Sequence, residues 1–515
     1  MGRLIVVSNR VADLTNPSQS GGLVVALADA LMTRGGIWFG WNGKTTDDPD
    51  SEGLSVERVG SIEKVGVPLT QADFDNYYVG YANSVLWPLF HYRIDLVDYS
   101  PAFFEGYRRV NQRFAANLQP LVKADDLVWV HDYHLIPLAR NLRRRGCRNA
   151  IGFFLHIPFP PPEILSAAPR HADVVKAMLD YDMIGFQTTT DVQNFRRYVE
   201  TTGLGTLAGA DTIAVGQRIV TARRVPIGID VDNFAELSRR PNEDVRIEQM
   251  RRHMLKRKQI IGVDRLDYSK GIPARFQAFE RLLNEHPDLE RRVSFLQIAP
   301  PTRETIDAYS RIRGETEGLA GAINGRFADF DWTPIRYIHR SIGRDKLASL
   351  FRTSHVGFVT PLRDGMNLVA KEYVAAQPDE NPGVLVLSRF AGAAEEMEEA
   401  LLVNPHDIDE MARGLHTALT MPLEERQERH RALLDRVRTS DVKTWADGFL
   451  EALSAAAAQQ ARPVRKRTKR APAVGGVGPG GLGYLMTLSL QDEETIGIGP
   501  ESHSEEGADQ DGTTH

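Results

Sequence analysis

Hydrophobic residues in this chain gather in short continuous runs, four to six residues long, separated by longer amphipathic stretches. Unalternating runs of this length are typical of strands buried on both faces. The predicted strands are Leu4–Ser8, Ile37–Trp41, Leu127–His131, Ile151–His156, Met183–Gln187, Gln259–Val263, Val293–Ile298, Ile335–Ile338, Val356–Val359 and Val384–Leu387. The predicted helices include Leu23–Met32, Leu135–Arg144, Asp173–Leu179, Ile272–Asn284 and Asp345–Phe351. Alternating strands and helices predict an α/β fold with parallel sheets and right-handed crossovers.

The alternation pauses at residues 225–230 and then resumes. A chain of 515 residues is also longer than one hydrophobic core usually supports. We therefore predict two α/β domains, residues 1–228 and 229–457, whose parallel sheets face each other across a ligand-binding cleft. The last helix of the second domain is expected to pack back on the first.

The composition changes after about residue 460. A basic segment, Arg462–Arg470, precedes a glycine-rich segment, Gly475–Gly483, and an acidic one, Asp492–Asp511. Such segments bury too little apolar surface to fold, so residues 458–515 are predicted to form a disordered tail. Contact of the basic segment with the acidic one, or with nucleic acid, stays open.

The bulk composition is that of an ordinary globular protein, with 42% hydrophobic and 25% charged residues. The net charge of −6 gives no general attraction to nucleic acid or anionic membranes, so anionic ligands require local basic clusters. The single cysteine, Cys147, fits a reducing compartment. Neither a signal sequence nor a membrane-spanning run is recognisable, so we expect a cytoplasmic protein.

Two loops in the second half lead from a strand into a helix and carry charged residues. In the first loop, residues 263–273, Arg265 and Lys270 lie at the carboxyl end of a predicted strand. Cations beside a helix N-terminus form an anion site that suits a diphosphate. Surface ion pairs with Asp264 or Asp267 are the alternative.

The second loop, residues 360–368, also opens a helix. Backbone amides near Asn367 and Leu368 are expected to face a bound phosphate. Glu372 lies one helical turn after Leu368, so it can reach the same ligand, and its carboxylate suits the two hydroxyls of a ribose. Asp364 has the alternative role of a helix cap.

The first half carries polar side chains at the carboxyl ends of two predicted strands. Asp132 and His156 suit the recognition of sugar hydroxyls. A metal site built on His131, Asp132 and His134 is the alternative, but no further ligands at metal spacing accompany them. Gly21-Gly22 before a helix indicates either an amide nest for a ligand or an ordinary turn.

Taken together, these segments resemble the trehalose-6-phosphate synthases, which are retaining glycosyltransferases with two Rossmann-like domains in the GT-B architecture. The resemblance covers roughly residues 3–455. It rests on the joint order of Val7-Ser8-Asn9-Arg10, Ser20-Gly21-Gly22-Leu23, Leu86-Trp87-Pro88, Tyr92-Arg93, His131-Asp132-Tyr133-His134, His156-Ile157-Pro158-Phe159-Pro160, Asp264–Gly271 and Arg363–Glu372.

The resemblance implies transfer of glucose from UDP-glucose to glucose-6-phosphate with retention, giving α,α-trehalose 6-phosphate and UDP, with no metal or other cofactor. It also implies a part in trehalose biosynthesis and stress protection. The implied donor-binding residues are Gly22, Arg265, Lys270, Asn367, Leu368 and Glu372, and Asp364 and His156 would hold the transferred glucose. The implied acceptor-binding residues are Arg10, Tyr78 and Arg303 for the phosphate and Trp87 and Asp132 for the sugar. Arg265, Lys270, Asp364 and His156 form the implied catalytic set.

Several alternatives stay open at this point. Another acceptor, such as glycerol-3-phosphate, or a non-catalytic sugar-phosphate sensor would use similar residues. No residue is diagnostic of the donor base, and UDP is expected from the resemblance. Asp132 and Asp364 are the candidate nucleophiles of a competing double displacement. We expect small-molecule substrates, no nucleic acid or membrane partner, a homo-oligomer, and no phosphatase-like domain after residue 455.

Overall fold

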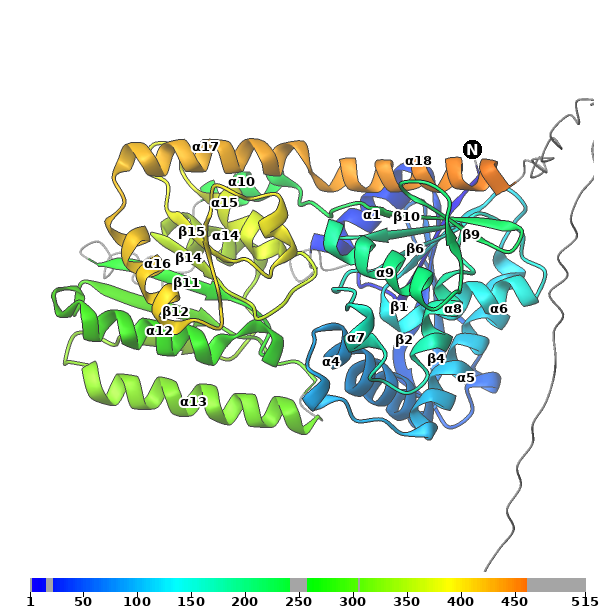
Figure 1. Cartoon of the computed structure of the whole chain (residues 1–515), viewed down its shortest axis with the longest axis horizontal. Helices are drawn as coiled ribbons and strands as arrows, with labels where there is room; N and C mark the ends of the chain where they lie inside the picture. The colour runs from blue at the N-terminus through cyan, green and yellow to red at the C-terminus, as the bar shows by residue number, and fades with distance from the viewer. Residues whose placement is uncertain (1, 15–21, 241–256, 304–305, 461–515) are drawn as a thin grey trace, which may run out of the picture. The chain divides into compact units, whose positions relative to one another are not determined.

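The computed structural model describes residues 2–14, 22–240, 257–303 and 306–460 (Figure 1). These residues fall within one compact unit, Met1–Val464. Their strands form two separate sheets, one of ten strands and one of six. The α/β class and the parallel sheets predicted from the sequence are therefore confirmed, whereas the domain bounds at residues 228 and 229 stay a prediction.

The ten-stranded sheet has the order β3-β4-β2-β1-β5-β6-β7-β10-β9-β8. Its strands are β1 (Leu4–Arg10), β2 (Gly36–Thr45), β3 (Ser55–Val59), β4 (Ile62–Leu69), β5 (Leu127–His131), β6 (Ile151–Phe154), β7 (Met183–Phe186), β8 (Thr206–Leu207), β9 (Thr212–Val215) and β10 (Arg218–Arg224). The pairs from β4 through β10 along the sheet are parallel, and only the edge pairs β3–β4, β10–β9 and β9–β8 are antiparallel. The parallel centre aligns the carboxyl ends of β5 and β6.

The six-stranded sheet is parallel throughout, in the order β13-β12-β11-β14-β15-β16. Its strands are β11 (Lys258–Val263), β12 (Val293–Ile298), β13 (Ile335–Ile338), β14 (Val356–Val359), β15 (Val384–Ser388) and β16 (Leu401–Val403). Strands β11 and β14 are neighbours, so the two charged loops that follow them leave the same edge of the sheet.

Helices connect most of these strands. Those before β10 are α1 (Gly22–Arg34), α2 (Pro49–Glu52), α3 (Gln71–Asp73), α4 (Trp87–Phe90), α5 (Pro101–Leu118), α6 (Leu138–Arg144), α7 (Pro162–Leu165), α8 (His171–Met178) and α9 (Thr189–Thr201). Those after β10 are α10 (Val231–Arg239), α12 (Ile272–Glu285), α13 (Asp307–Phe327), α14 (Arg344–Thr353), α15 (Leu368–Ala376), α16 (Ile408–Thr420), α17 (Leu423–Thr439) and α18 (Val442–Gln460). A π-helix, η2 (Phe74–Leu86), and the 3₁₀ turns η3 (Ile94–Leu96), η4 (Gln119–Leu121), η5 (Tyr133–Leu135), η6 (Tyr268–Lys270), η7 (Pro287–Leu289) and η8 (Gly392–Glu395) complete the set.

All ten predicted strands are present, although several begin or end at other residues than predicted; the strand expected to end at His156, for example, ends at Phe154. Two further boundaries also differ. The helix expected from Leu135 begins at Leu138, because residues 133–135 form the turn η5 and Pro137 is the N-cap. Residues 458–460, which the sequence placed in the tail, form the end of α18. The rest of the predicted tail, residues 461–515, lies outside the described residues.

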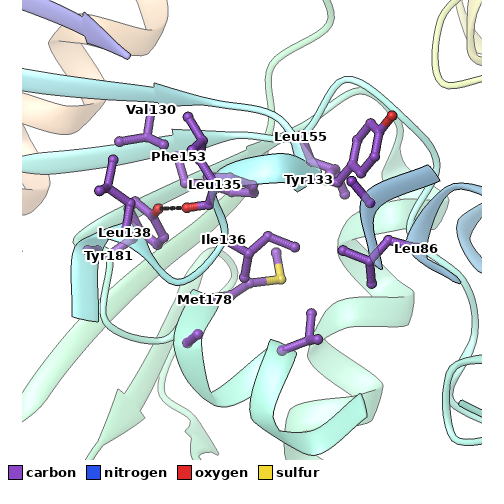
Figure 2. Packing of buried hydrophobic residues seen from close by; sticks show 14 of the residues in the cluster. Leu86, Val130, Tyr133, Leu135, Ile136, Leu138, Phe153, Leu155, Met178 and Tyr181 are labelled. Carbon is purple, nitrogen blue, oxygen red and sulfur yellow. Dashed lines mark hydrogen bonds between the residues drawn. The ribbon is translucent and has the colours of Figure 1, made fainter. Parts of the chain in front are cut away.

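Buried side chains fix the loop that follows β5 (Figure 2). Figure 2 shows Leu135, Ile136 and Leu138 packed among Phe153, Leu155, Met178 and Tyr181. Three successive loop carbonyls accept buried hydrogen bonds: Tyr133 from the Tyr107 hydroxyl (2.6 Å), His134 from the Asn111 amide (3.1 Å) and Leu135 from the Tyr181 hydroxyl (2.8 Å). Satisfied buried carbonyls hold a loop in one conformation, so the backbone directly after Asp132 is fixed.

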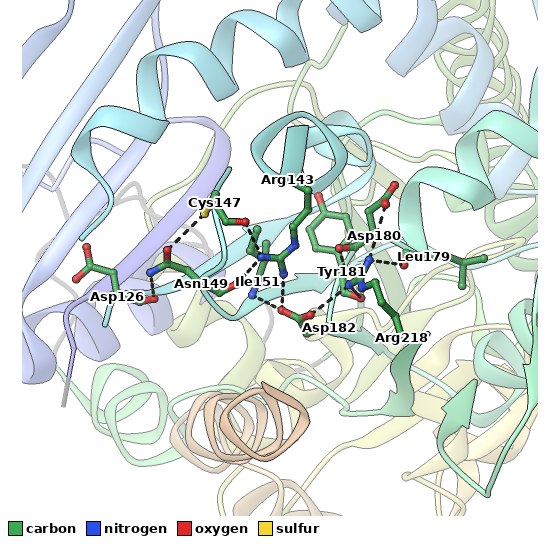
Figure 3. Close-up of polar contacts among 10 residues, drawn as sticks. All are labelled: Asp126, Arg143, Cys147, Asn149, Ile151, Leu179, Asp180, Tyr181, Asp182 and Arg218. Atoms are coloured by element: carbon green, nitrogen blue, oxygen red, sulfur yellow. Dashed lines mark hydrogen bonds and ion pairs between the residues drawn. The ribbon is translucent and has the colours of Figure 1, made fainter. Parts of the chain in front are cut away.

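A charged network ties together the opposite, amino-terminal edge of the same strands (Figure 3). Asp182, which precedes β7, accepts hydrogen bonds from Arg143 (2.6 Å) and Arg218 (3.2 Å) and from the backbone amide of Ile151, which begins β6 (2.9 Å). The side chain of Asn149 donates to the backbone carbonyl of Asp126, just before β5 (2.9 Å). This edge is therefore held by buried and half-buried polar contacts, at the end of the strands opposite to Asp132 and His156.

The chain passes between the two sheets twice. It leaves the first sheet after β10 and reaches the second at β11, and helix α18 returns to pack on α1, β7 and β10. The two passages touch, since the amide of Val442 donates to the carbonyl of Ile229 at 3.2 Å. Of the helices in the described ranges, none combines the length and apolar character of a membrane span.

Candidate active site

Asp132 and His156 lie together at the carboxyl ends of β5 and β6, as the sequence predicted. The amide of His156 donates to Asp132 Oδ1 at 3.2 Å. Burial raises the pKa of Asp132 to about 6, although backbone hydrogen bonds and the charges of Arg303 and Arg265 oppose the rise. Asp132 has φ 73° and ψ 166°, a conformation that costs a non-glycine residue about 1–3 kcal/mol and is typical of functional sites.

His156 contacts His131, which is buried. His156 Nε2 and His131 Nδ1 lie 3.1 Å apart. Burial lowers the pKa of His156 to about 3 and that of His131 well below its usual value, so both rings are neutral at pH 7. In the described part of the chain, no group of three or more His, Cys, Asp or Glu side chains is arranged to hold a metal. The expected absence of a metal cofactor stays a prediction.

Lys270 and Asp364 form a buried ion pair between the two charged loops of the second sheet. Lys270 Nζ lies 2.5 Å from Asp364 Oδ2, and the side chains are 9% and 15% exposed. Asp364 also accepts a hydrogen bond from the Asn367 amide at 3.0 Å. Burial alone would raise the pKa of Asp364, but Lys270 outweighs it and holds that pKa below its usual value. Asp364 is therefore ionised, and Lys270 stands beside it as a cation.

The loop that carries Asp364 touches the first half of the chain. A Cβ atom on Gly365 would lie 2.0 Å from the carbonyl oxygen of His156, so only a glycine allows the two backbones to approach this closely. Asp364 and His156, the two residues expected to hold the transferred sugar, are thereby brought to one place.

The alternative ion pairs considered for the Arg265 loop do not form. Asp264 pairs with Arg275 at 2.5 Å, and Asp267 pairs with Arg303 at 3.1 Å. Arg265 is exposed, and no acidic partner for it is found among the described residues. A guanidinium without a carboxylate partner at this loop remains available for an anionic ligand.

Trp87 contacts cations from two different loops. The guanidinium carbons of Arg303 and Arg265 lie 3.8 and 5.7 Å from the centre of its ring. Trp87 follows η2 in the first half of the chain, whereas both arginines follow strands of the second sheet. Cation–π contacts of this kind join the two halves at the predicted acceptor residues.

Arg303 is held by a buried network that the sequence did not reveal. Its guanidinium, on a side chain only 6% exposed, donates to Asp267 (3.1 Å) and to the hydroxyls of Tyr309 (2.7 Å) and Tyr133 (3.1 Å). Burial would raise the pKa of Asp267, but the charge of Arg303 and other nearby cations lowers it to about 2. Asp267 lies within the predicted anion-binding loop, but the sequence suggested for it only an ion pair with Arg265 or Lys270. Tyr133 belongs to a segment that carries the family resemblance but was given no role, and Tyr309 was not predicted.

Arg10 and Tyr78 both contact the ring of Trp41. The Arg10 guanidinium is 5.6 Å from the centre of the Trp41 ring, and the rings of Trp41 and Tyr78 are 6.4 Å apart. From Tyr78, ring contacts lead to Trp87 through His134 and Tyr133, with centroid separations of 5.7, 3.9 and 5.7 Å. The predicted acceptor residues of the first half thus line one continuous series of aromatic rings.

The N-terminus of α15 carries the remaining donor residues. Asn367, with φ 73°, caps the helix by accepting from the amide three residues on (3.3 Å), so the alternative of Asp364 as the cap was wrong. Leu368 begins the helix and Glu372 lies one turn later. Glu372 Oε1 lies 3.9 Å from Arg344 Nε, and burial raises the pKa of Glu372 to about 7 even though Arg344 opposes the rise. Arg344 was not predicted.

Gly22 is the first residue of α1. Ser20 and Gly21, the rest of the predicted glycine loop, lie outside the described residues.

His91, four residues after Trp87, was not predicted either. Its Nδ1 lies 2.7 Å from the Trp87 carbonyl oxygen, and burial lowers its pKa to about 4 despite the opposing charge of Asp267.

This chain is similar to known proteins in both sequence and fold. The model of glycosyltransferase family 20 matches residues 6–455. The chain is 47% identical over 458 residues to the trehalose-6-phosphate synthase of Sinorhizobium fredii, which covers 88% of this chain and 99% of that protein. These matches confirm the family resemblance predicted from the sequence.

Solved structures of two relatives extend the comparison to the fold. The first is an α,α-trehalose-phosphate synthase (UDP-forming) from Burkholderia vietnamiensis, with a TM-score of 0.87 and 50% identity over 90% of this chain and 99% of that one. The second is the enzyme of this name from Burkholderia xenovorans in complex with glucose-6-phosphate, with a TM-score of 0.83 and 51% identity over 88% of this chain and 100% of that one. The GT-B architecture predicted from the sequence is thereby confirmed.

Proposed function

Because this chain belongs to glycosyltransferase family 20, we propose that it transfers glucose from UDP-glucose to glucose-6-phosphate with retention, giving α,α-trehalose 6-phosphate and UDP. One observation carries the proposal. The guanidiniums of Arg265 and Arg303, from the second half of the chain, contact Trp87 of the first half, and their charges oppose the burial that raises the pKa of Asp132 to about 6. Relatives at 47–50% identity are named for this activity.

In this proposal the donor binds to the loops of the second sheet. Arg265 and Lys270 bind the diphosphate, and the amides at Asn367 and Leu368 face it at the N-terminus of α15, with help from Gly22. Glu372 accepts hydrogen bonds from the ribose hydroxyls. Ribose binding requires an ionised Glu372, so the hydroxyls must lower the raised pKa of this carboxyl.

Asp364 and His156 hold the transferred glucose. The ionised carboxylate of Asp364 accepts hydrogen bonds from sugar hydroxyls, while its ion pair with Lys270 keeps it charged in a buried place. His156 is neutral, so it adds a hydrogen bond without a charge. Lys270 contacts the carboxylate of Asp364, which holds the glucose, and it also binds the diphosphate. Lys270 therefore links the binding of the two parts of the donor.

The acceptor binds against the first half of the chain. Arg10, Tyr78 and Arg303 bind the phosphate of glucose-6-phosphate, and Trp87 and Asp132 position its ring. Arg303 is already held by Asp267, Tyr309 and Tyr133, so a phosphate must share or displace one of these partners. Such a preorganised arginine places the acceptor without a large loss of side-chain freedom.

The chemistry that follows is a front-face transfer. As the bond from the anomeric carbon to the diphosphate breaks, negative charge grows on the leaving phosphate, and Arg265, Lys270 and the helix amides stabilise it. The anomeric hydroxyl of the acceptor attacks from the same face, and the departing phosphate takes its proton. The competing path forms a glucosyl ester on Asp132 or Asp364. If a covalent glucosyl adduct were trapped on either carboxylate, the reaction would be a double displacement and not a front-face transfer.

We further propose that no metal or organic cofactor takes part, that the protein is cytoplasmic, and that it self-associates. UDP-glucose and glucose-6-phosphate are its small-molecule substrates. The first of these points is tested together with the reaction, because a chelator removes metal ions from the assay.

The test is to incubate the purified protein with glucose-6-phosphate and UDP-, ADP- or GDP-glucose in EDTA and to identify the sugar product by NMR. We expect UDP release and an α,α-linked disaccharide phosphate. Turnover only with glycerol-3-phosphate would move the protein to another acceptor specificity. Tight binding of both ligands without turnover would make it a sugar-phosphate sensor.

A further inference from the structure

A polar pocket on the first half of the chain is lined by residues of α5, α6 and α8. The three helices are labelled in Figure 1. The volume of the pocket is about 290 Å³, near the lower end of the range for small-molecule sites. None of the residues that line it belongs to the donor or acceptor set. A ligand in this pocket would therefore bind apart from the proposed donor and acceptor.

Four arginines from the three helices line this pocket: Arg108 on α5, Arg140 and Arg144 on α6, and Arg170 at the start of α8. Arg140 is fixed by Asp180 (2.6 Å) and by the carbonyl of Lys176 (2.6 Å). The guanidiniums of Arg108, Arg144 and Arg170 are held less firmly and can bind a ligand.

Arg108 and Arg170 form exposed ion pairs, with Glu105 (2.9 Å) and Asp173 (3.4 Å) on the same turn of helix. The Arg170 guanidinium also lies over the ring of Phe104, 5.3 Å from its centre. Exposed pairs of this kind contribute little free energy, so a multiply charged anion can replace them. Arg144 is exposed and has no acidic partner within ion-pair distance among the described residues. Planar guanidiniums from separate helices suit the oxygens of a phosphate, which they bind in pairs.

The remaining polar lining suits hydroxyl groups. Asp173, Asn141 and Gln112 present a carboxylate and two amides to the same space, beside the apolar Phe104. A carboxylate opposes binding of a bare phosphate but accepts hydrogen bonds from hydroxyls. We infer that this pocket binds a small phosphorylated polyol, with its phosphate on Arg108, Arg144 and Arg170 and its hydroxyls toward Asp173 and Asn141.

The lining helix α5 also holds the acceptor loop. Arg108 and Gln112 directly follow Tyr107 and Asn111, whose side chains donate to the loop carbonyls after Asp132. Helix α5 therefore connects the pocket to the loop after Asp132, and the proposal extends to a change in acceptor affinity when the pocket is occupied. This second part rests on the proposed function, whereas the binding itself does not.

The binding test titrates ribose 5-phosphate, with ribose as the neutral comparison, into the full chain in saturating UDP. Glucose-6-phosphate is left out, because it is itself a phosphorylated polyol and would compete for the pocket. The wild type is expected to bind ribose 5-phosphate saturably, and Arg144→Gln and Arg108→Gln are expected to weaken the binding at least about tenfold, since each removes a charge-assisted hydrogen bond. Arg145→Gln is the matched control, an exposed neighbour that does not line the pocket. Equal melting temperatures show that the variants are folded.

Absence of saturable binding to the wild type, or equal weakening by Arg145→Gln, would overturn the site. For the coupling, ribose 5-phosphate is expected to shift the KM for glucose-6-phosphate in the wild type and in Arg145→Gln more than in Arg144→Gln. An identical shift in all three would overturn the coupling and indicate competition at the acceptor site. If the wild type shows no turnover at all, the proposed function fails, but the binding of ribose 5-phosphate can still be compared among the variants.

Discussion

Arg265 and Lys270 belong to one loop but differ in burial and partners, and this predicts different effects of their removal. Arg265 is exposed and has no acidic partner among the described residues, whereas Lys270 is 7% exposed and pairs with the buried Asp364. Arg265→Gln is expected to lower kcat/KM about 10–150-fold, as the loss of about 1.5–3 kcal/mol to a charged phosphate implies. Its unfolding free energy should stay within about 0.5 kcal/mol of the wild type.

Lys270→Gln should lower both activity and stability, because it leaves the carboxylate of Asp364 buried without its cation. Breaking a buried pair costs about 3 kcal/mol or more. Steady-state kinetics and urea unfolding of both variants test this, with the exposed Arg239→Gln as control. Equal stability of the Lys270 and Arg265 variants would contradict the role of the buried ion pair.

Glu372 predicts a pH dependence of donor binding. Burial raises its pKa to about 7, so it is largely protonated at pH 6 and largely ionised at pH 8. Only the ionised form accepts hydrogen bonds from both ribose hydroxyls, so the KM for UDP-glucose should fall as pH rises through this window. At saturating acceptor, Glu372→Gln should raise KM and flatten its pH profile. The exposed Glu398→Gln should keep the wild-type profile, and an unchanged profile in Glu372→Gln would exclude this role.

At the scale of single elements, the sequence predicted most of what positions the site. The buried strands β5, β6, β11 and β14 were recognisable because they are short, apolar and unalternating. The hairpin of β3 and β4 was missed, since β3 is largely exposed and its pattern is polar. The π-helix η2 was also missed, because its hydrogen-bond pattern leaves no sequence signature that distinguishes it from an α-helix.

The site, like the elements, contains some residues that the sequence predicted and others that it did not. Residues at strand ends, such as Asp132 and Asp364, could be predicted because parallel strands bring their carboxyl ends to one edge. The partners that hold them come from distant parts of the chain. Tyr309 and Tyr133 meet Asp267 and Arg303 only through the tertiary fold, and no local pattern marks that meeting.

The start of α15 shows how an element and the site depend on one residue. Asn367 adopts φ 73°, caps the helix and donates to Asp364. Asn367→Ala is expected to destabilise the protein by about 1–3 kcal/mol, because it removes the cap and places an alanine in the left-handed region. Asn367→Gly should cost less, since glycine adopts this conformation freely. Urea unfolding measures both, and an equal loss would mean that φ contributes nothing.

At the scale of the whole molecule, the two halves of the site already meet, at Gly365 and His156 and at Trp87 with Arg265 and Arg303, so these contacts must open for substrates to enter and close again for the transfer. Domain closure is the usual way to exclude water during such a step. The two passages of the chain between the sheets touch at Ile229 and Val442, so any such motion must bend both at this point. We therefore expect UDP and glucose-6-phosphate together to reduce the radius of gyration measured by X-ray scattering. An unchanged radius would contradict closure.

Gly228 is the residue on which this crossing depends. A Cβ atom there would lie 2.0 Å from the carbonyl oxygen of Ser440, so Gly228→Ala must push the two passages apart. It should destabilise the protein by about 1–3 kcal/mol or more and reduce the ligand-induced change in radius. Gly448→Ala on α18 is the matched control, because nothing lies within 4 Å of its added methyl group, and alanine should stabilise that helix by up to about 1 kcal/mol. Effects of the same sign in both variants would show that the close approach at Gly228 does not govern the crossing.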